Sequence, residues 1–148
     1  KAPQSFSHNF TLIFRILFGG DSTSGISYAF LRIITGIFMA THGYGKVFLQ
    51  LDKFTGYVTS LGMPGFLAPV AAVSEFFGGI CLAAGLFSRV WSFFIAVTMA
   101  VAAFVAHKGQ PFGERELALL YLAVCIMFML KGGGKWSADN LIYKNSQK

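Results

Sequence analysis

The chain has 148 residues, of which 55% are hydrophobic, 16% aromatic and only 12% charged. This composition excludes an ordinary soluble domain, because a soluble bundle of that size has to present polar faces to water. The net charge of +6 does not indicate a nucleic acid partner, since the Lys and Arg residues are scattered between apolar runs, where topology signals and contacts with anionic lipids are expected. The sequence therefore predicts an integral membrane protein that contacts lipids and no nucleic acid.

Residues 1–25 are predicted to form an arm that precedes the membrane domain in the sequence. Asn9 is placed to cap a short apolar helix over residues 10–18, which is too short to span a bilayer and is expected to lie in the membrane interface. Arg15 interrupts this apolar stretch and no cleavage pattern follows it, so we expect no secretory signal. The run GGDSTSG at residues 19–25 then breaks the structure and offers caps for the next helix.

Four longer apolar stretches predict four membrane spans. A helix rises about 1.5 Å per residue, so some twenty residues cross a hydrocarbon layer of about 30 Å. The predicted spans are residues 26–46, 66–87, 90–107 and 116–131. The predicted fold class is all-α: a membrane four-helix bundle with an N-terminal interfacial helix.

The remaining segments are expected outside the bilayer core. Residues 51–61 are short and amphipathic, which predicts a helix on the membrane surface that ends at a Gly- and Pro-containing turn. Residues 137–148 form a polar tail that we expect to end loosely, so the membrane domain covers residues 26–136. Four spans put both termini on one side, and that side collects seven Lys or Arg residues against four on the other. This bias predicts that both termini are cytoplasmic.

Glu75 is the single charge in the second predicted span. A carboxylate at that depth usually pairs with another polar group or takes part in function. At 100° per residue, Arg32 and Lys46 share one face of the first helix, and Glu75 shares a face of the second helix with Gly78 and Gly79. The depths of Arg32 and Glu75 differ by roughly 9 Å from the helical rise, which a long Arg side chain largely closes. We therefore predict a structural ion pair between Arg32 and Glu75.

Further titratable residues lie toward the non-cytoplasmic side of the predicted bundle: His42, Lys46, His107 and Glu116. One interpretation is a buried ion pair that fixes helix register, with the other residues marking membrane boundaries. A second is a small polar pocket that binds a ligand or moves protons, with Glu75 and His42 as the titrating groups. A third is a haem held by His42 and His107, for which two lone histidines are weak evidence.

The two cysteines and the glycine-rich faces leave alternatives open. Cys81 and Cys125 lie in different apolar segments without CxxC spacing, so they are expected to be small packing residues, and a redox pair between helices remains open. The glycine faces permit close helix approach either between copies of the chain or inside one bundle. The sequence contains no phosphate loop, dinucleotide fingerprint or HExxH motif, and it predicts no metal site.

Three stretches carry a resemblance to a known family. They are LRIITGIFMATHGYGKV, then SEFFGGICLAAGLFSR, then ELALLYLAVCIMFMLKGGGKWSADNLI, and in this order they resemble the DoxX family of small four-helix membrane proteins over residues 28–142. The resemblance implies a bacterial inner-membrane bundle linked to redox chemistry, since relatives include the membrane subunit of a thiosulfate:quinone oxidoreductase and membrane partners in assemblies that handle thiols and reactive oxygen. The family's polar set falls on Arg32, His42, Lys46, Glu75, His107 and Glu116.

Together these observations predict a membrane component of a redox system, with a quinone-sized site between helices near the outer leaflet. His42 or Glu75 would exchange the protons that accompany quinone reduction, and Arg32 and Lys46 would stabilise the developing oxyanion. The expected partners are soluble or membrane oxidoreductase subunits, and the enzyme, if it is one, is a subunit of a quinone-linked oxidoreductase. The alternatives are a small transporter or channel, and a non-catalytic anchor for soluble oxidoreductases.

Overall fold

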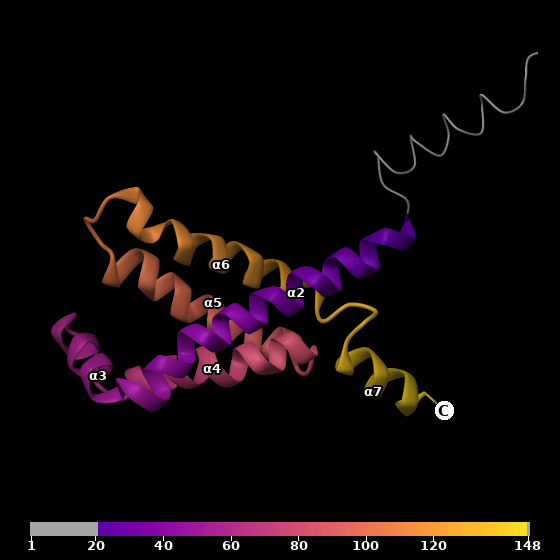
Figure 1. The fold of residues 1–148 in the computed structure, drawn as a ribbon, viewed down its shortest axis with the longest axis horizontal. Coiled ribbons are helices and arrows are strands. Elements are labelled where there is room, and N and C mark those ends of the chain that lie inside the picture. Colours follow the sequence, from indigo (N-terminus) through magenta and orange to yellow (C-terminus); the bar gives the residue numbers. More distant parts are fainter. Residues whose placement is uncertain (1–20, 148) are drawn as a thin grey trace, which may run out of the picture.

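The computed structural model describes residues 21–147, and the predicted interfacial helix at residues 10–18 lies outside this range. Every element within it is helical, which confirms the all-α fold class (Figure 1). In chain order the elements are α2 (Asp21–Tyr44), η1 (Gly45–Leu49), α3 (Leu51–Ser60), α4 (Leu67–Ala84), α5 (Ser88–Val101), η2 (Ala102–Ala106), α6 (Phe112–Lys131) and α7 (Ala138–Ser146).

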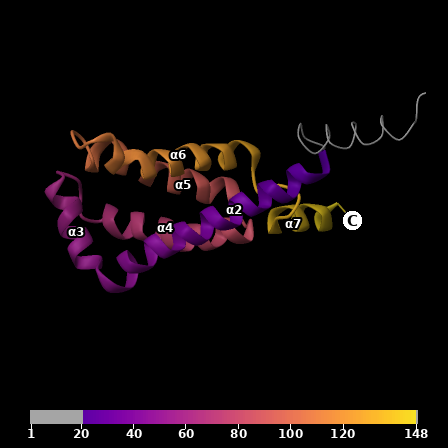
Figure 2. The ribbon, with the colours of Figure 1, turned by 45° about the horizontal axis from the view of Figure 1, so that its top comes forward.

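The four long helices lie side by side, and two short helices occupy opposite ends of the molecule. α2 packs along α4, α4 forms a hairpin with α5, and α6 packs on α5, while α3 lies across one end and α7 at the other (Figures 1 and 2). Fully buried side chains from all four long helices form one core: Met39, Leu82, Ile95, Cys125 and Phe128. Cys125 is a packing residue of this core, and both cysteines are free thiols.

Local chemistry explains where the helices begin and end. α4 ends at Gly85, whose φ of 73° is the left-handed conformation that glycine adopts without steric cost. α6 begins at Phe112, directly after Pro111, rather than at residue 116 as predicted, because Pro fixes φ and lacks an N–H that a helix interior would need. α2 likewise begins earlier than predicted, at Asp21, and uses the polar residues that were assigned to the arm.

Glycines allow α2 and α4 to touch backbone to backbone. A Cβ atom on Gly36 would lie 2.5 Å from the carbonyl oxygen of Gly79, and one on Gly79 would lie 2.5 Å from the amide nitrogen of Ala40. A Cβ on Gly43 would overlap the backbone of Phe76. The glycine faces are therefore used inside the molecule, which answers the question of their role that the sequence left open.

The C-terminal tail is folded, so the expectation of a loose end is wrong. Ser137 caps α7 by accepting a hydrogen bond from the amide of Asn140. The Asp139 carboxylate accepts hydrogen bonds from the amides of Phe87 (2.7 Å) and Ser88 (2.9 Å), and its own amide donates to the carbonyl of Gly85 (2.9 Å). Asp139 thereby satisfies free backbone groups at the turn between α4 and α5, which a polar tail in isolation could not reveal.

The outside of the long helices is covered with large apolar side chains. Among them are Phe30, Ile37, Phe38, Val70, Phe77, Phe93, Phe94, Leu120 and Ile126, all exposed. Within the described residues, two helical stretches are long and apolar enough to cross a membrane by length and composition, Leu67–Ala84 and Ser88–Ala106. α2 and α6 are of similar length but carry more polar residues. A hydrocarbon environment accounts for this surface, because water-soluble monomers rarely expose apolar patches of this extent.

Candidate functional site

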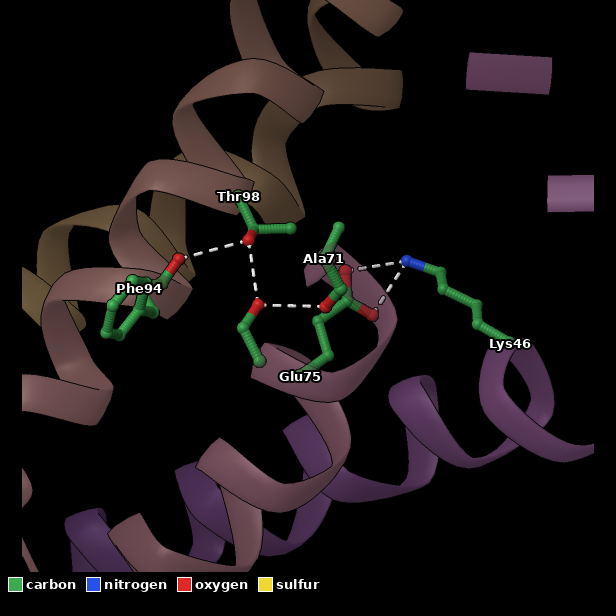
Figure 3. A network of polar contacts seen from close by, with 6 residues as sticks. Lys46, Ala71, Glu75, Phe94 and Thr98 are labelled. Atoms are coloured by element: carbon green, nitrogen blue, oxygen red, sulfur yellow. Dashed lines mark hydrogen bonds and ion pairs between the residues drawn. The ribbon is translucent and has the colours of Figure 1, made fainter. Parts of the chain in front are cut away.

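Glu75 forms an ion pair with Lys46. The ammonium nitrogen of Lys46 lies 2.7 Å from both carboxylate oxygens of Glu75 (Figure 3). Glu75 is almost fully buried, with 1% of its side chain exposed, while 33% of the Lys46 side chain is exposed. The carboxylate therefore depends on one partner that also reaches toward the surface of the protein.

The predicted pair of Arg32 and Glu75 is wrong, and the packing of α2 on α4 explains why. The backbone of α2 meets Glu75 and Phe76 at Gly43, so the residues level with Glu75 lie near position 43. Helical side chains lean toward the N-terminus of their helix, so Lys46, about one turn further on, leans back toward Glu75. Arg32 lies eleven residues before Gly43, roughly 16 Å away along the axis.

Arg32 has a structural position at the opposite end of the bundle. Its Nη1 donates to the carbonyls of Leu82 and Ala83, and its Nη2 donates to the carbonyl of Trp136, each at 2.6 Å. The guanidinium thus neutralises the last carbonyls of α4, where the helix dipole is negative, and ties them to the C-terminal segment. It belongs to neither cavity described below.

Hydroxyl groups fix the helix turn that carries Glu75. The Ser74 hydroxyl lies 2.8 Å from the carbonyl oxygen of Ala71 and 2.9 Å from the hydroxyl of Thr98, which lies 3.0 Å from the carbonyl oxygen of Phe94 (Figure 3). The two hydroxyl protons are shared among these three contacts. This network joins α4 to α5 beside the ion pair. Its effect is to hold the Glu75 backbone in one position while the side chain points toward Lys46.

A large apolar pocket of about 440 Å³ opens over the ion pair. α3, α4 and the α5–η2 segment supply its walls, mainly with aliphatic and aromatic side chains such as Tyr57, Leu67 and Val101. Lys46, Glu75, Thr98 and His107 provide the polar groups. Its size and its mixture of an apolar wall with a few convergent polar groups are typical of sites for small organic molecules.

Two π-helical segments bring polar residues to this pocket. Lys46 lies in η1 and His107 directly follows η2, and each segment is five residues long. π-helical turns are rare and often mark functional sites, because the wider turn re-aims side chains. Gly45 is a weak signal for the first segment, whereas the sequence AAFVA of the second gives none.

A smaller cleft of about 130 Å³ lies between α2 and α6 and reaches the ion pair from another side. Its polar lining consists of His42, Lys46, Glu75, His107, Glu114 and Tyr121. His42 is exposed, and its ring contacts the edge of Tyr121 with centroids 6.1 Å apart. His42 therefore approaches Glu75 only through this cleft and does not line the apolar pocket.

Glu114, which was not predicted as a site residue, lines the cleft, and the predicted site residue Glu116 does not. Glu114, Leu117, Ala118 and Tyr121 share one helix face and line the cleft, whereas Glu116 lines neither cavity. A helical projection from Pro111 onward could have identified Glu114, but it required the correct start of α6.

The arrangement offers one hydrogen-bond donor and one acceptor to a ligand in the apolar pocket. A Lys ammonium carries three N–H donors, and two of them face the oxygens of Glu75, so one remains. Nδ1 of His107 is 2.9 Å from the side-chain oxygen of Gln110 and donates to it, so Nε2 of the neutral ring is free to accept a hydrogen bond. The site is therefore suited to a carbonyl or hydroxyl oxygen attached to an apolar body. No cluster of metal ligands occurs among the residues described.

Comparisons with known proteins agree with this description. The DoxX family model matches residues 27–108. An uncharacterised protein of Haemophilus influenzae is 39% identical over 78% of this chain and 90% of its own length. The Bacillus subtilis protein named "Putative oxidoreductase CatD" is 31% identical over 79% of this chain and 87% of its own. The Escherichia coli inner membrane protein YqjF is 30% identical over 76% and 89%.

No solved structure matches the chain. The family match covers more than half of the chain and includes all the residues that line the apolar pocket, and the matches cover 87–90% of the length of each relative. The chain belongs to the DoxX family.

Proposed function

We propose that the protein is an inner-membrane component of a redox system and that its apolar pocket binds a quinone. The observation that carries the proposal is the Lys46–Glu75 ion pair at the polar side of a 440 Å³ apolar pocket. A quinone combines an apolar ring and tail with two carbonyl oxygens, and this is the chemistry that the pocket complements. The names of the relatives support the setting, since one is named as an oxidoreductase and another as an inner membrane protein.

In this function Lys46 donates its remaining N–H to a quinone oxygen, and Glu75 exchanges the proton that accompanies reduction. A bound quinone accepts two electrons and two protons to become a quinol, and an associated oxidoreductase subunit supplies the electrons. The apolar wall of the pocket holds the quinone ring and excludes water from it, and Lys46 and Glu75 supply the charged groups. With both termini cytoplasmic, as the charge bias predicts, the proposed quinone head would lie beside these polar groups near the outer leaflet.

Binding of a short-chain ubiquinone to the full chain in lipid nanodiscs tests the proposal. Native mass spectrometry and a visible absorption spectrum of the purified protein first identify any molecule that accompanies it. Titration with the quinone should then give saturable binding that Ala71→Phe abolishes, because Ala71 lines the pocket and a phenyl ring would fill it.

Ala123→Phe is the matched control, because Ala123 is exposed on α6 and lines neither cavity. Equal binding by both Phe variants would show that the quinone binds elsewhere or only partitions into lipid. Flux of a small solute through proteoliposomes without any quinone binding would favour a transporter instead.

A further inference from the structure

The apolar pocket and the cleft meet at the same three side chains. Lys46, Glu75 and His107 line both cavities. On the pocket side their neighbours are mainly aliphatic and aromatic, whereas on the cleft side the neighbours include His42, Glu114 and Tyr121. The buried carboxylate is thus reached from two sides that differ in chemistry.

Ring contacts between α2 and α6 border the cleft. Near the C-terminal end of α6 the two helices touch, since Tyr28 packs edge-on against Phe128 with ring centroids 5.3 Å apart. Toward the start of α6 the ring contact of His42 with Tyr121 flanks the cleft. The buried side chains of Met39 and Met99 also line the cleft, and Glu114, exposed in the first turn of α6, lies at its mouth.

The cleft has the properties of a water-filled space. Within the described part of the chain, the side chains of His42, Glu114 and Tyr121 line it without a hydrogen bond to another protein group. Polar groups in such a position are satisfied by water. The volume of 130 Å³ admits several water molecules, each of which occupies about 30 Å³ in the liquid.

We propose that this cleft is the aqueous path by which Glu75 exchanges protons with the outer solution, with Glu114 as the entry group. The inference rests on the proposed function and adds the source of its protons. A hydronium ion at the mouth gives a proton to the Glu114 carboxylate and becomes water, and the proton then passes from Glu114 through water in the cleft, past His107, to Glu75. There a new O–H bond forms on the Glu75 carboxylate, and Glu114 is left ionised again. Water thus reaches Glu75 without entering the apolar pocket.

Six titratable groups line the two cavities together with Glu75, and all of them except Tyr57 belong to this path or to the ion pair. They are Lys46 from η1, His42 from α2, His107 after η2, and Glu114 and Tyr121 from α6, together with Tyr57 of α3 at the far wall of the apolar pocket. Among the described residues that line the two cavities, Glu114 is the one carboxylate other than Glu75. The path therefore predicts a specific effect of Glu114 that its neighbours on α6 do not share.

Thiol labelling tests whether water fills the cleft. Leu117 lines the cleft and Leu120 does not, although their exposed fractions are similar, 49% and 59%. In the full chain in nanodiscs, Leu117→Cys should react quickly with a charged thiosulfonate reagent and Leu120→Cys slowly, with the native chain as the blank for its own two cysteines. Equal rates for the two variants would overturn the proposal.

Proton-transfer kinetics test the role of Glu114. After a pH jump, time-resolved infrared spectroscopy follows the carboxyl band of Glu75, which is assigned by its loss in Glu75→Gln. Glu114→Gln should slow the appearance of this band by roughly 100-fold, the lower end of what a positioned proton-transfer group contributes. Glu116→Gln, two residues away and outside both cavities, should leave the rate unchanged.

Equal rates in Glu114→Gln and Glu116→Gln would overturn the inference. The measurement contains no quinone, and Glu114 does not line the apolar pocket, so quinone affinity in Glu114→Gln should equal that of the native chain. If Glu114→Gln does not slow the appearance of the Glu75 band while quinone still binds, the proton path alone is contradicted. If no quinone binds but Glu114→Gln still slows the appearance of the Glu75 band, the proposed function alone is contradicted.

Discussion

Lys46 and Glu75 are unequal partners. Glu75 is buried and Lys46 is the residue with which it forms its ion pair, whereas a third of the Lys46 side chain is exposed. Loss of one member of a buried ion pair leaves the other charge without compensation, and the cost depends on how well water can reach the remaining charge. Loss of Lys46 should therefore harm the fold more than loss of Glu75.

We expect Lys46→Met to lower the free energy of unfolding by about 3 kcal/mol, the lower end for a broken buried pair, because water reaches the unpaired carboxylate of Glu75 only through the cleft. Glu75→Gln should cost less, since the exposed part of Lys46 can turn toward water or headgroups. The double variant Lys46→Met, Glu75→Leu should recover most of the loss. Denaturant unfolding in detergent measures all three.

Lys53→Met on α3 is the control for this series, because Lys53 is exposed and forms no ion pair in the described structure. A loss for Lys46→Met no larger than that of the control would contradict the assigned dependence of Glu75 on Lys46.

At the residue scale the sequence predicted Glu75 correctly as a buried carboxylate that needs a partner, but not which partner. Helical periodicity orders side chains around one helix, and it contains no information on the offset between two helices. That offset is fixed by the contact of Gly43 with the backbone of Glu75 and Phe76, which brings Lys46 within reach and leaves Arg32 far away.

The contact between α2 and α4 depends on the absence of side chains at Gly36 and Gly79. Gly36→Ala or Gly79→Ala should lower the melting temperature markedly, because the added Cβ would meet backbone atoms at 2.5 Å and the two helices would have to separate. The cost of such overpacking is typically about 1–3 kcal/mol. Thermal unfolding followed by circular dichroism in detergent measures it.

Gly56→Ala provides the matched control, since Gly56 lies inside α3 with no atom within 4 Å of its added Cβ. That change should leave stability the same or raise it by up to about 1 kcal/mol, because Ala favours helix over Gly. A similar gain for Gly36→Ala would contradict the close packing of α2 on α4.

At the scale of elements, apolar run lengths predicted the four long helices well, since the hydrophobic requirement of a membrane span acts on every residue in it. The π-helical segments and the start of α6 were not predicted, because they depend on tertiary packing and on one proline. These are the features that bring Lys46, His107 and Glu114 to the two cavities. The candidate site was thus less predictable than the fold that holds it.

The whole molecule is joined at one end by the contacts of Arg32 and Asp139. Asp139→Ala should lower the free energy of unfolding by about 1–3 kcal/mol, because the amides of Phe87 and Ser88 lose a charged acceptor. Asn145→Ala, on the same helix and exposed, should have no measurable effect. Chemical unfolding compares the two, and equal stabilities would mean that α7 is not part of the cooperative unit.

The same contacts determine the order in which parts of the fold can form during synthesis of the chain. Phe87 and Asp139 are separated by 52 positions, and Arg32 and Trp136 by 104, so the hydrogen bonds that finish the α4–α5 turn and the start of the bundle involve residues that are synthesised well after their partners. Until the ribosome has released that segment, the Arg32 guanidinium has only part of its acceptors. Nascent chains should therefore remain accessible to quality-control proteases until α7 has emerged from the ribosome.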